Sequence, residues 1–185
     1  QRVSFDMSIP GSDLEYYTVN YLGETYIPLL DKEDVSLRLK ARLGYGDGFG
    51  DSSGLPFLKN FFAGGIRSVR GYAYNSLGAD NTLYETSTAG VFETAGGNVL
   101  LTGTAALQFP LPGVKETDQA RLSLFTDVGQ IYNDNIEVDE LRYSAGLALA
   151  WMTPIGPLSF TYAAALNSES RDETEGFQFS IGSTF

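Results

Sequence analysis

Hydrophobic and polar residues alternate along most of this 185-residue chain. The clearest case is the segment 33–45, where apolar side chains occupy every second position and Ser, Arg and Lys occupy the positions between them. A period of two residues is typical of a β-strand with two unlike faces. The pattern predicts eight strands, at residues 3–9, 17–27, 33–45, 97–109, 119–132, 141–152, 157–166 and 176–185.

The longest stretch without charge, residues 143–168, has the length of a membrane-spanning helix. Pro154, Gly156 and Pro157 stand in its middle, where they would break a helix. Apolar residues alternate with small or polar ones on both sides of this interruption. The stretch is therefore interpreted as a hairpin of two strands.

Alternation alone does not distinguish a soluble β-sandwich from a membrane β-barrel. A tilted strand of about 10 residues spans the roughly 25 Å apolar band of an outer-membrane barrel, and several of the predicted strands have that length. Short connections also alternate with long ones, which include a segment of about 50 residues and two acidic loops. These features favour an all-β, antiparallel transmembrane barrel.

The charged positions decide which face meets lipid. Three cations on one strand, Arg38, Lys40 and Arg42, would together cost roughly 6 to 12 kcal/mol in lipid, about the stability of a whole domain. Their face is therefore predicted to line a polar lumen. The same alternation assigns to the lumen Arg2, Asp6, Glu24, Gln108, Arg121, Asp127 and Arg142, and to lipid Leu122, Leu124, Val128, Leu147, Leu149, Trp151, Leu158, Phe160 and Tyr162. The aromatic residues expected at the membrane interfaces are Trp151, Tyr132, Tyr143 and Phe185.

The composition narrows the possible functions. The chain has no His and no Cys, which excludes Ser-His-Asp and Cys-His catalysis, disulfides and the usual zinc sites. A net charge of −11 disfavours nucleic acid as a partner. We expect no enzyme activity, no cofactor and no metal. The chain begins with Gln1 and carries no signal-peptide pattern, so we expect a mature product or a fragment.

The last ten residues carry an apolar face that ends on an aromatic residue. Phe177, Phe179, Ile181 and Phe185 lie on this face, and Gly182 belongs to the same predicted seam strand. An apolar strand at a chain end must be paired or recognised, because its free edge would otherwise aggregate. The segment resembles the C-terminal recognition signal of outer-membrane proteins.

The long segment between the third and fourth predicted strands contains Val69-Arg70-Gly71-Tyr72. This motif and its surroundings, among them Phe125-Thr126-Asp127-Val128-Gly129 and Trp151-Met152-Thr153-Pro154, resemble the BamA family of outer-membrane barrel assembly proteins over essentially the whole chain. The resemblance implies that residues 1–185 are the C-terminal half of a sixteen-stranded barrel of the bacterial surface antigen type. It also implies that residues 46–96 form an extracellular loop folded into the lumen, that the C-terminus is periplasmic, and that the family's periplasmic polypeptide-binding modules are absent.

The resemblance to the BamA family implies a function in the folding and insertion of client barrel proteins, at a seam between the first and last strands of the barrel. The implied partners are client outer-membrane proteins, outer-membrane lipid and lipopolysaccharide, and the lipoprotein subunits of the assembly machinery. The segment 176–185 would form one side of the seam, so the chain alone should lack insertase activity. The alternative is a self-standing eight-stranded outer-membrane barrel with a structural or adhesion role, although such a barrel has little room for a 50-residue inward loop.

The resemblance implies that Arg70 pairs with Asp127 and so holds the loop against the barrel wall. Phe125 belongs to the same group of motif partners, and Gln108 is expected at the position on the preceding strand where the family often has a second acidic residue. Gly71 should permit a backbone turn that a Cβ would hinder.

Two expectations concern the remaining parts of the chain. The acidic groups at 134–140 and 169–175 could bind Ca²⁺ or bridge to lipopolysaccharide, but solvated loops are the simpler interpretation. Two free strand edges are not tolerated in lipid, so the isolated chain must close into a barrel of its own, pair with another copy or be completed by missing strands. We expect closure into its own barrel, with the Arg70 loop partly displaced or disordered.

Overall fold

The computed structural model describes residues 1–30, 35–79, 82–86, 92–111, 119–154 and 156–182. Within these ranges, no helix has the length and apolar character that crossing a membrane requires. Most of the regular structure in these ranges is β-sheet, and short 3₁₀ turns lie at Phe57–Lys59 and Val138–Glu140.

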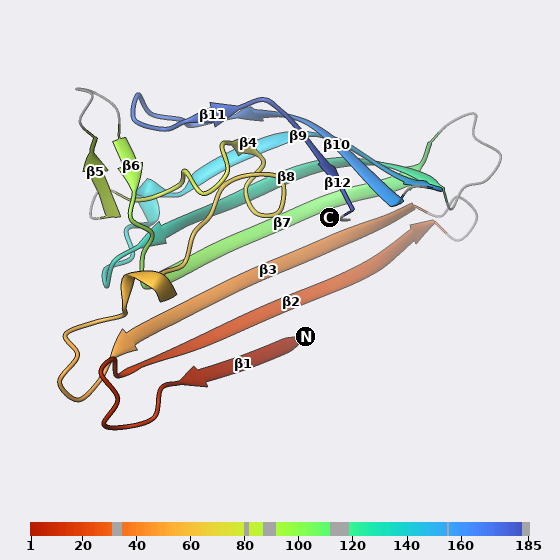
Figure 1. The fold of residues 1–185 in the computed structure, drawn as a ribbon. Coiled ribbons are helices and arrows are strands. Elements are labelled where there is room, and N and C mark those ends of the chain that lie inside the picture. Colours follow the sequence, from red (N-terminus) through yellow and green to blue (C-terminus); the bar gives the residue numbers. More distant parts are fainter. Residues whose placement is uncertain (31–34, 80–81, 87–91, 112–118, 155, 183–185) are drawn as a thin grey trace.

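Eight strands form one antiparallel sheet in the order β1-β2-β3-β7-β8-β9-β10-β12 (Figure 1). Their bounds are β1 Arg2–Met7, β2 Tyr16–Leu30, β3 Val35–Gly48, β7 Val99–Pro110, β8 Ala120–Tyr132, β9 Arg142–Thr153, β10 Gly156–Ala165 and β12 Phe177–Ile181. The eight strands predicted from alternation, and their antiparallel arrangement, are confirmed. Two small two-stranded sheets lie outside it, one of β4 (Gly71–Tyr72) with β11 (Thr174–Glu175) and one of β5 (Leu83–Glu85) with β6 (Phe92–Thr94).

The long loop between β3 and β7 comprises residues 49–98 and starts three residues later than expected. Strand β3 continues to Gly48 because its Gly-rich end still pairs with β2, where Tyr16 stands opposite Gly48. In Figure 1 the loop crosses in front of β7 to β10, on the hollow side of the curved sheet.

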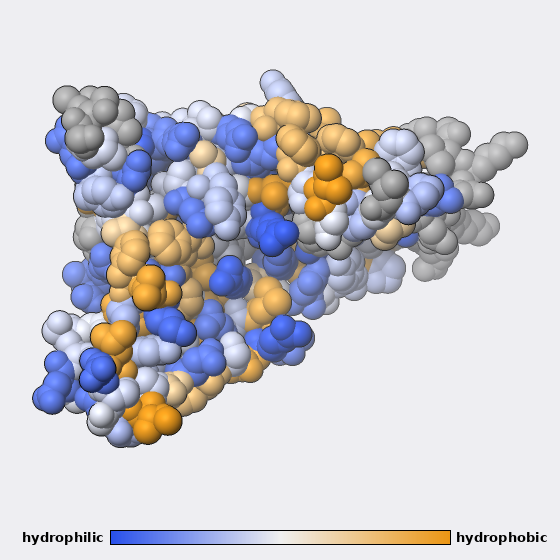
Figure 2. All heavy atoms as spheres, viewed as in Figure 1, coloured by the Kyte–Doolittle hydropathy of each residue, from blue (hydrophilic) through white to orange (hydrophobic). Residues whose placement is uncertain are grey.

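The two faces of the sheet differ as the charged positions predicted. Large apolar side chains such as Leu124, Leu147 and Tyr162 are exposed on the outer face. Polar groups on the inner face, such as Asp127 and Thr161, are almost completely buried by the loop and the neighbouring strands. Figure 2 shows the molecule hollowed between the β1 and β12 edges, with hydrophilic residues on much of the visible inner surface.

The interfacial aromatic residues divide into two kinds. Trp151 and Tyr143 are exposed on the outer face near strand ends, at 47% and 42% of their surface. Tyr132 is fully buried because loop residue Ala79 and strand residue Val99 pack on it, so its expected interfacial position is wrong. Phe185 lies outside the described residues.

The sheet is open. In the described part of the chain, β1 pairs with β2 alone and β12 with β10 alone, so the expectation of self-closure is wrong. An eight-stranded barrel has an interior just large enough for its own side chains. Here the loop occupies the inner side, and a sheet of eight strands has no room to close around it.

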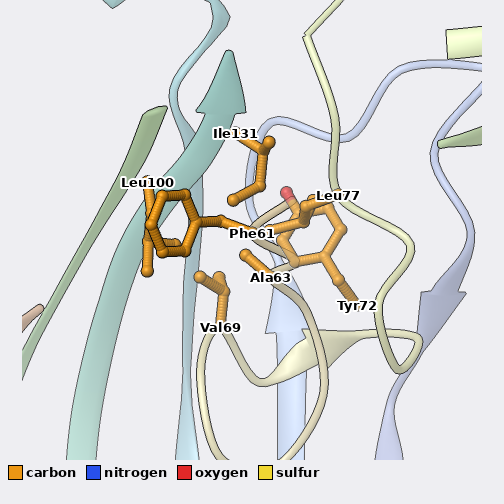
Figure 3. Close-up of a cluster of buried hydrophobic side chains, with 7 residues drawn as sticks. All are labelled: Phe61, Ala63, Val69, Tyr72, Leu77, Leu100 and Ile131. Atoms are coloured by element: carbon orange, nitrogen blue, oxygen red, sulfur yellow. The ribbon is translucent and has the colours of Figure 1, made fainter. Parts of the chain in front are cut away.

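The loop brings its own hydrophobic cluster to the inner face (Figure 3). The cluster joins loop residues to Leu100 of β7 and Ile131 of β8, and its buried members are Phe61, Ala63, Val69, Tyr72, Leu77, Leu100 and Ile131. Each is less than one-tenth exposed. Burial of a large apolar side chain contributes about 1.5 to 3 kcal/mol, so the cluster fixes the loop on the wall. The expectation of a displaced loop is therefore wrong.

Candidate functional site: the loop motif and the last strand

Arg70 and Asp127 form a bidentate ion pair at the centre of the inner face. Arg70 donates from Nε to Asp127 Oδ2 at 2.7 Å and from Nη2 to Oδ1 at 2.8 Å. Its backbone N–H also donates to Oδ2, at 3.1 Å. The side chain of Arg70 is 5% exposed and that of Asp127 is 0% exposed. Paired fork geometry of this kind satisfies both charges where water does not reach them.

Phe125 supports the pair from the same strand. The guanidinium carbon of Arg70 lies 3.3 Å from the centre of the Phe125 ring, and Phe125 itself is buried. A desolvated cation over an aromatic face gains about 2 kcal/mol. Since residues two apart in a strand share a face, β8 presents the carboxylate and the ring together.

Gln108 lies elsewhere on the inner face. The register of β7 with β8 places Gln108 opposite Ser123, whereas Thr104 stands opposite Asp127. These two positions on β7 are four residues apart, a separation of about 13 Å along a strand. The register therefore does not place this expected partner beside Asp127.

Gly71 lets the loop pass close to the wall. Its φ is +90°, in the region that favours glycine, and a Cβ there would meet the Ala163 Cβ at 3.2 Å and the Ala165 nitrogen at 3.4 Å. The small side chains of Ala163 and Ala165 on β10 therefore leave room for the loop backbone at Gly71. The close approach is what allows the motif to lie flat on the sheet.

Tyr72 completes the motif as a fully buried side chain. Its hydroxyl faces the Tyr143 carbonyl at 3.3 Å and the Asn167 Oδ1 at 3.4 Å. Burial, with a smaller effect from the Asp172 carboxylate, raises the pKa of the Tyr72 hydroxyl to about 12. The group therefore stays protonated and acts as a hydrogen-bond donor at any physiological pH.

The last hairpin contacts the motif directly, which the sequence analysis did not anticipate. Strand β11 pairs with the motif strand β4, and the Ala73 N–H donates to the Glu173 carbonyl at 2.9 Å. From β12, the Gln178 Nε2 donates to the Tyr72 carbonyl at 2.7 Å. The sequence feature that could have indicated this contact is Gln178, the one amide side chain in a strand that otherwise alternates aromatic and apolar residues with small ones.

Strand β12 is a short free edge. The outward side chains of Phe177, Phe179 and Ile181 are 56%, 63% and 65% exposed. Gly182 ends the strand with a φ of +81°, and its N–H donates to the Pro157 carbonyl. Phe185, the last predicted member of this group, lies outside the described residues.

The acidic loops are partly neutralised by arginine. Arg142 is fully buried and donates from Nε to Asp172 Oδ2 at 2.6 Å, with Glu169 3.1 Å from its Nη2. Arg171 lies 2.8 Å from Glu169 and 3.7 Å from Glu140. In the described ranges, no group of three or more acidic side chains has the arrangement that a metal ion needs. The carboxylates of Asp172 and Glu140, whose side chains are 4% and 13% exposed, are thus structural. This corrects the interpretation of both loops as simply solvated.

A second group of cations lies beside the motif. Arg38 donates to Glu24 at 2.7 Å, and a cavity of about 140 Å³ separates Arg38 and Lys40 of β3 from Arg67 and Ser68 of the loop. The inner face is locally basic here, although the chain as a whole is acidic.

An open antiparallel sheet of long strands with this loop and motif defines a class of protein. The Omp85 superfamily domain matches residues 1–185, and the chain belongs to that superfamily. Among the curated relatives, the outer membrane protein assembly factor BamA of Neisseria meningitidis serogroup B is 35% identical over 99% of this chain and 26% of its own length. A SAM50-like protein of Schizosaccharomyces pombe is 24% identical over 96% of this chain and 37% of its own length.

The fold agrees with a solved relative. The crystal structure of BamA from Haemophilus ducreyi lacking POTRA domains 1–3 matches with a TM-score of 0.86 and 33% identity, covering 99% of this chain and 38% of that one. The chain therefore spans between about a quarter and two-fifths of the length of these three relatives.

Proposed function

We propose that this chain is the C-terminal half of the barrel of an outer-membrane protein assembly factor, which folds and inserts client β-barrel proteins without enzyme chemistry. The observation that carries the proposal is the free edge of β12 beside a loop motif held rigidly on the inner wall. The names of the relatives, outer membrane protein assembly factors, support the same function.

The backbone of β12 is what a client strand would pair with. Gly176 and Gly182 both hydrogen-bond to β10, and in an antiparallel ladder alternate residues face the same neighbour. The backbone groups of Phe177, Phe179 and Ile181 therefore face the free edge. Unpaired backbone groups in lipid cost several kcal/mol each, so this edge has a strong tendency to accept another strand.

The outer face and the connections support a location in the outer membrane. The outward side chains of the central strands are apolar, as lipid requires. The short β9–β10 connection lies at the same end of the sheet as the end of β12, and the long loop leaves and rejoins the sheet at the other end (Figure 1). Short periplasmic turns and long extracellular loops are typical of such barrels, which supports a periplasmic C-terminus.

We assign to the long loop the role of a fixed filler of the lumen. Its hydrophobic cluster and the Arg70–Asp127 pair hold it on the wall, and its remaining surface faces the hollow of the sheet. In the whole protein the partners would be client barrel proteins, the lipids and lipopolysaccharide around the barrel, and the lipoprotein subunits of the assembly machinery. A self-standing eight-stranded barrel is not favoured, because the described sheet is open and its inner side is occupied.

The test is the folding rate of a client barrel in liposomes containing the full-length natural protein that includes this chain. Phe179→Pro removes the edge-facing N–H of β12, and Phe179→Leu keeps it while preserving an apolar side chain. We expect the proline variant to slow client folding at least tenfold and the leucine variant to act like the wild type. Equal rates for both variants would contradict the proposal. The isolated 185-residue chain should give no acceleration.

A further inference from the structure

We propose that Gln178 is a positioning residue that couples the loop motif to the β12 edge. The inference rests on the proposed function, in which that edge accepts client strands. It concerns a side chain that points inward, away from any client, and that acts through the backbone of Tyr72.

The contact is short, buried and specific. Gln178 is 5% exposed, and its Nε2 donates to the Tyr72 carbonyl at 2.7 Å. The same carbonyl accepts from the Gly65 N–H at 3.0 Å, so both of its lone pairs are used. The second amide proton faces Glu175 Oε2 at 3.2 Å. The amide is therefore held between the loop and the final hairpin.

The motif spans the inner face from one strand to another that is not its neighbour. Asp127 lies on β8, and Arg70 binds it through three hydrogen bonds. Two residues further along the loop, Tyr72 meets Gln178 on β12. Because β9 and β10 lie between these strands in the sheet, the motif forms a bridge over them. Gly71, packed on Ala163 of β10, is the middle of that bridge.

The edge strand is held by β10 on one side, and Gln178 joins its inner face to the loop. Strand β12 has five residues, pairs with β10 alone in the described structure, and exposes more than half of each outward side chain. On its inner side, Gln178 is buried and Ser180 is half-buried. The orientation of the edge therefore depends on the position of the Tyr72 carbonyl, and this position depends on the Arg70–Asp127 pair.

The first test is hydrogen exchange of the β12 amides in the full-length natural protein in membranes. Gln178→Met keeps the length of the side chain and removes both hydrogen bonds, and Gln178→Leu is a second variant that removes the donor. We expect the amides of residues 178 and 180, which face β10, to exchange about tenfold faster in either variant. The matched control is Gln130→Met, because Gln130 is also fully buried and donates to a loop carbonyl, that of Glu140 at 2.9 Å, away from the motif. The control should change β12 exchange less than twofold.

The second test separates coupling from a merely structural role. Asp127→Asn should accelerate β12 exchange more when Gln178 is present than in the Gln178→Met background, where only the pairing of β11 with β4 and the Ala73–Glu173 hydrogen bond still link the motif to the final hairpin. Equal acceleration by Asp127→Asn in both backgrounds would overturn the inference, as would unchanged β12 exchange in both Gln178 variants.

Client folding distinguishes this inference from the proposed function. Slower client folding together with faster β12 exchange supports both. Faster β12 exchange with an unchanged client folding rate supports the coupling and contradicts the proposed use of the edge. Unchanged β12 exchange contradicts the coupling, whatever the client folding rate.

Discussion

The Arg70–Asp127 pair, which anchors the loop, and the edge strand β12 belong to the same wall of the molecule but have opposite properties. At the anchor, every charge has a partner, and the side chains of Arg70 and Asp127 are at most 5% exposed. At the edge, three outward side chains are more than half exposed, and one side of the backbone has no strand beside it in the described structure.

The difference indicates which region binds another strand and which region fixes the structure. A buried, fully satisfied ion pair gains nothing from a new partner and is costly to disturb. An unpaired strand edge gains a hydrogen bond for each group that a new strand supplies. The anchor is therefore suited to hold geometry and the edge to bind, and Gln178 links the two.

The largest expected effect comes from breaking the anchor. Asp127→Asn leaves the Arg70 guanidinium buried without a full countercharge, which should cost about 3 to 5 kcal/mol. Residues 49–98 should then become sensitive to protease in the folded protein. The control is Arg38→Ala, whose partner Glu24 is 32% exposed and can be hydrated, so the loss there should be about 1 kcal/mol or less. Unchanged cleavage of the loop in Asp127→Asn would show that the pair does not hold it.

A smaller effect is expected at the outer side of the edge. Phe179→Arg places a charge on the proposed lipid face, at a cost of about 2 to 4 kcal/mol at the bilayer midplane and about 0 to 1 near an interface. The unfolding free energy in bilayers should fall, whereas the loop should stay protected because the anchor is untouched. The control is Leu58→Arg, since Leu58 is 87% exposed on the long loop. Equal stability of the two variants in bilayers would place Phe179 outside lipid.

The backbone of the anchor gives a third prediction. Gly71→Ala must adopt a φ of +90° against β10, which should cost about 1 to 3 kcal/mol. Gly54→Ala, on the same loop, has open space around the added Cβ and should be neutral. Thermal unfolding of both variants measures the difference. A stable Gly71→Ala would mean that the motif does not need to lie flat on β10.

The smallest effect concerns an exposed carboxylate. The Gly11 and Asp51 N–H groups donate to Glu15 and lower its pKa below the usual 4.5. This contribution to stability is present above the unfolded pKa and is lost as pH falls through the lower folded pKa. Exchange of the Asp51 amide should therefore accelerate, after correction for intrinsic rates, as pH falls below about 4.5. Glu15→Gln should remove this dependence, and an identical pH profile in that variant would contradict the assignment.

Local patterns sufficed to predict the sheet, because each strand carries its own alternation of outward and inward residues. The Arg70–Asp127 pair followed from the motif and its resemblance to a family. Gln108 was placed wrongly because the β7–β8 register depends on a pairing that local alternation does not determine: every second position on the strand satisfies the same pattern.

Contacts between distant segments were the part that the sequence did not reveal. Gln178 and Tyr72 are 106 residues apart, and neither position shows that one meets the carbonyl of the other. The position of Tyr132 near a strand end predicts an interfacial aromatic, but the loop residue that packs on it is remote in sequence. Self-closure is wrong because the hydrophobic cluster holds the loop on the inner wall, and the sequence does not show how much of the interior the folded loop occupies.

Cysteine cross-linking between β12 and a client barrel caught during folding tests the central claim most directly. The chain has no cysteine, so Phe177→Cys, Phe179→Cys and Ile181→Cys each introduce one reactive site within it. The account predicts that each forms a cross-link to a different client residue, in the order of a single strand register. Leu147→Cys, 53% exposed on β9 in the interior of the sheet, should form none. Equal, unordered cross-linking at Leu147 and at β12 would contradict the claim that the edge is the site of client pairing.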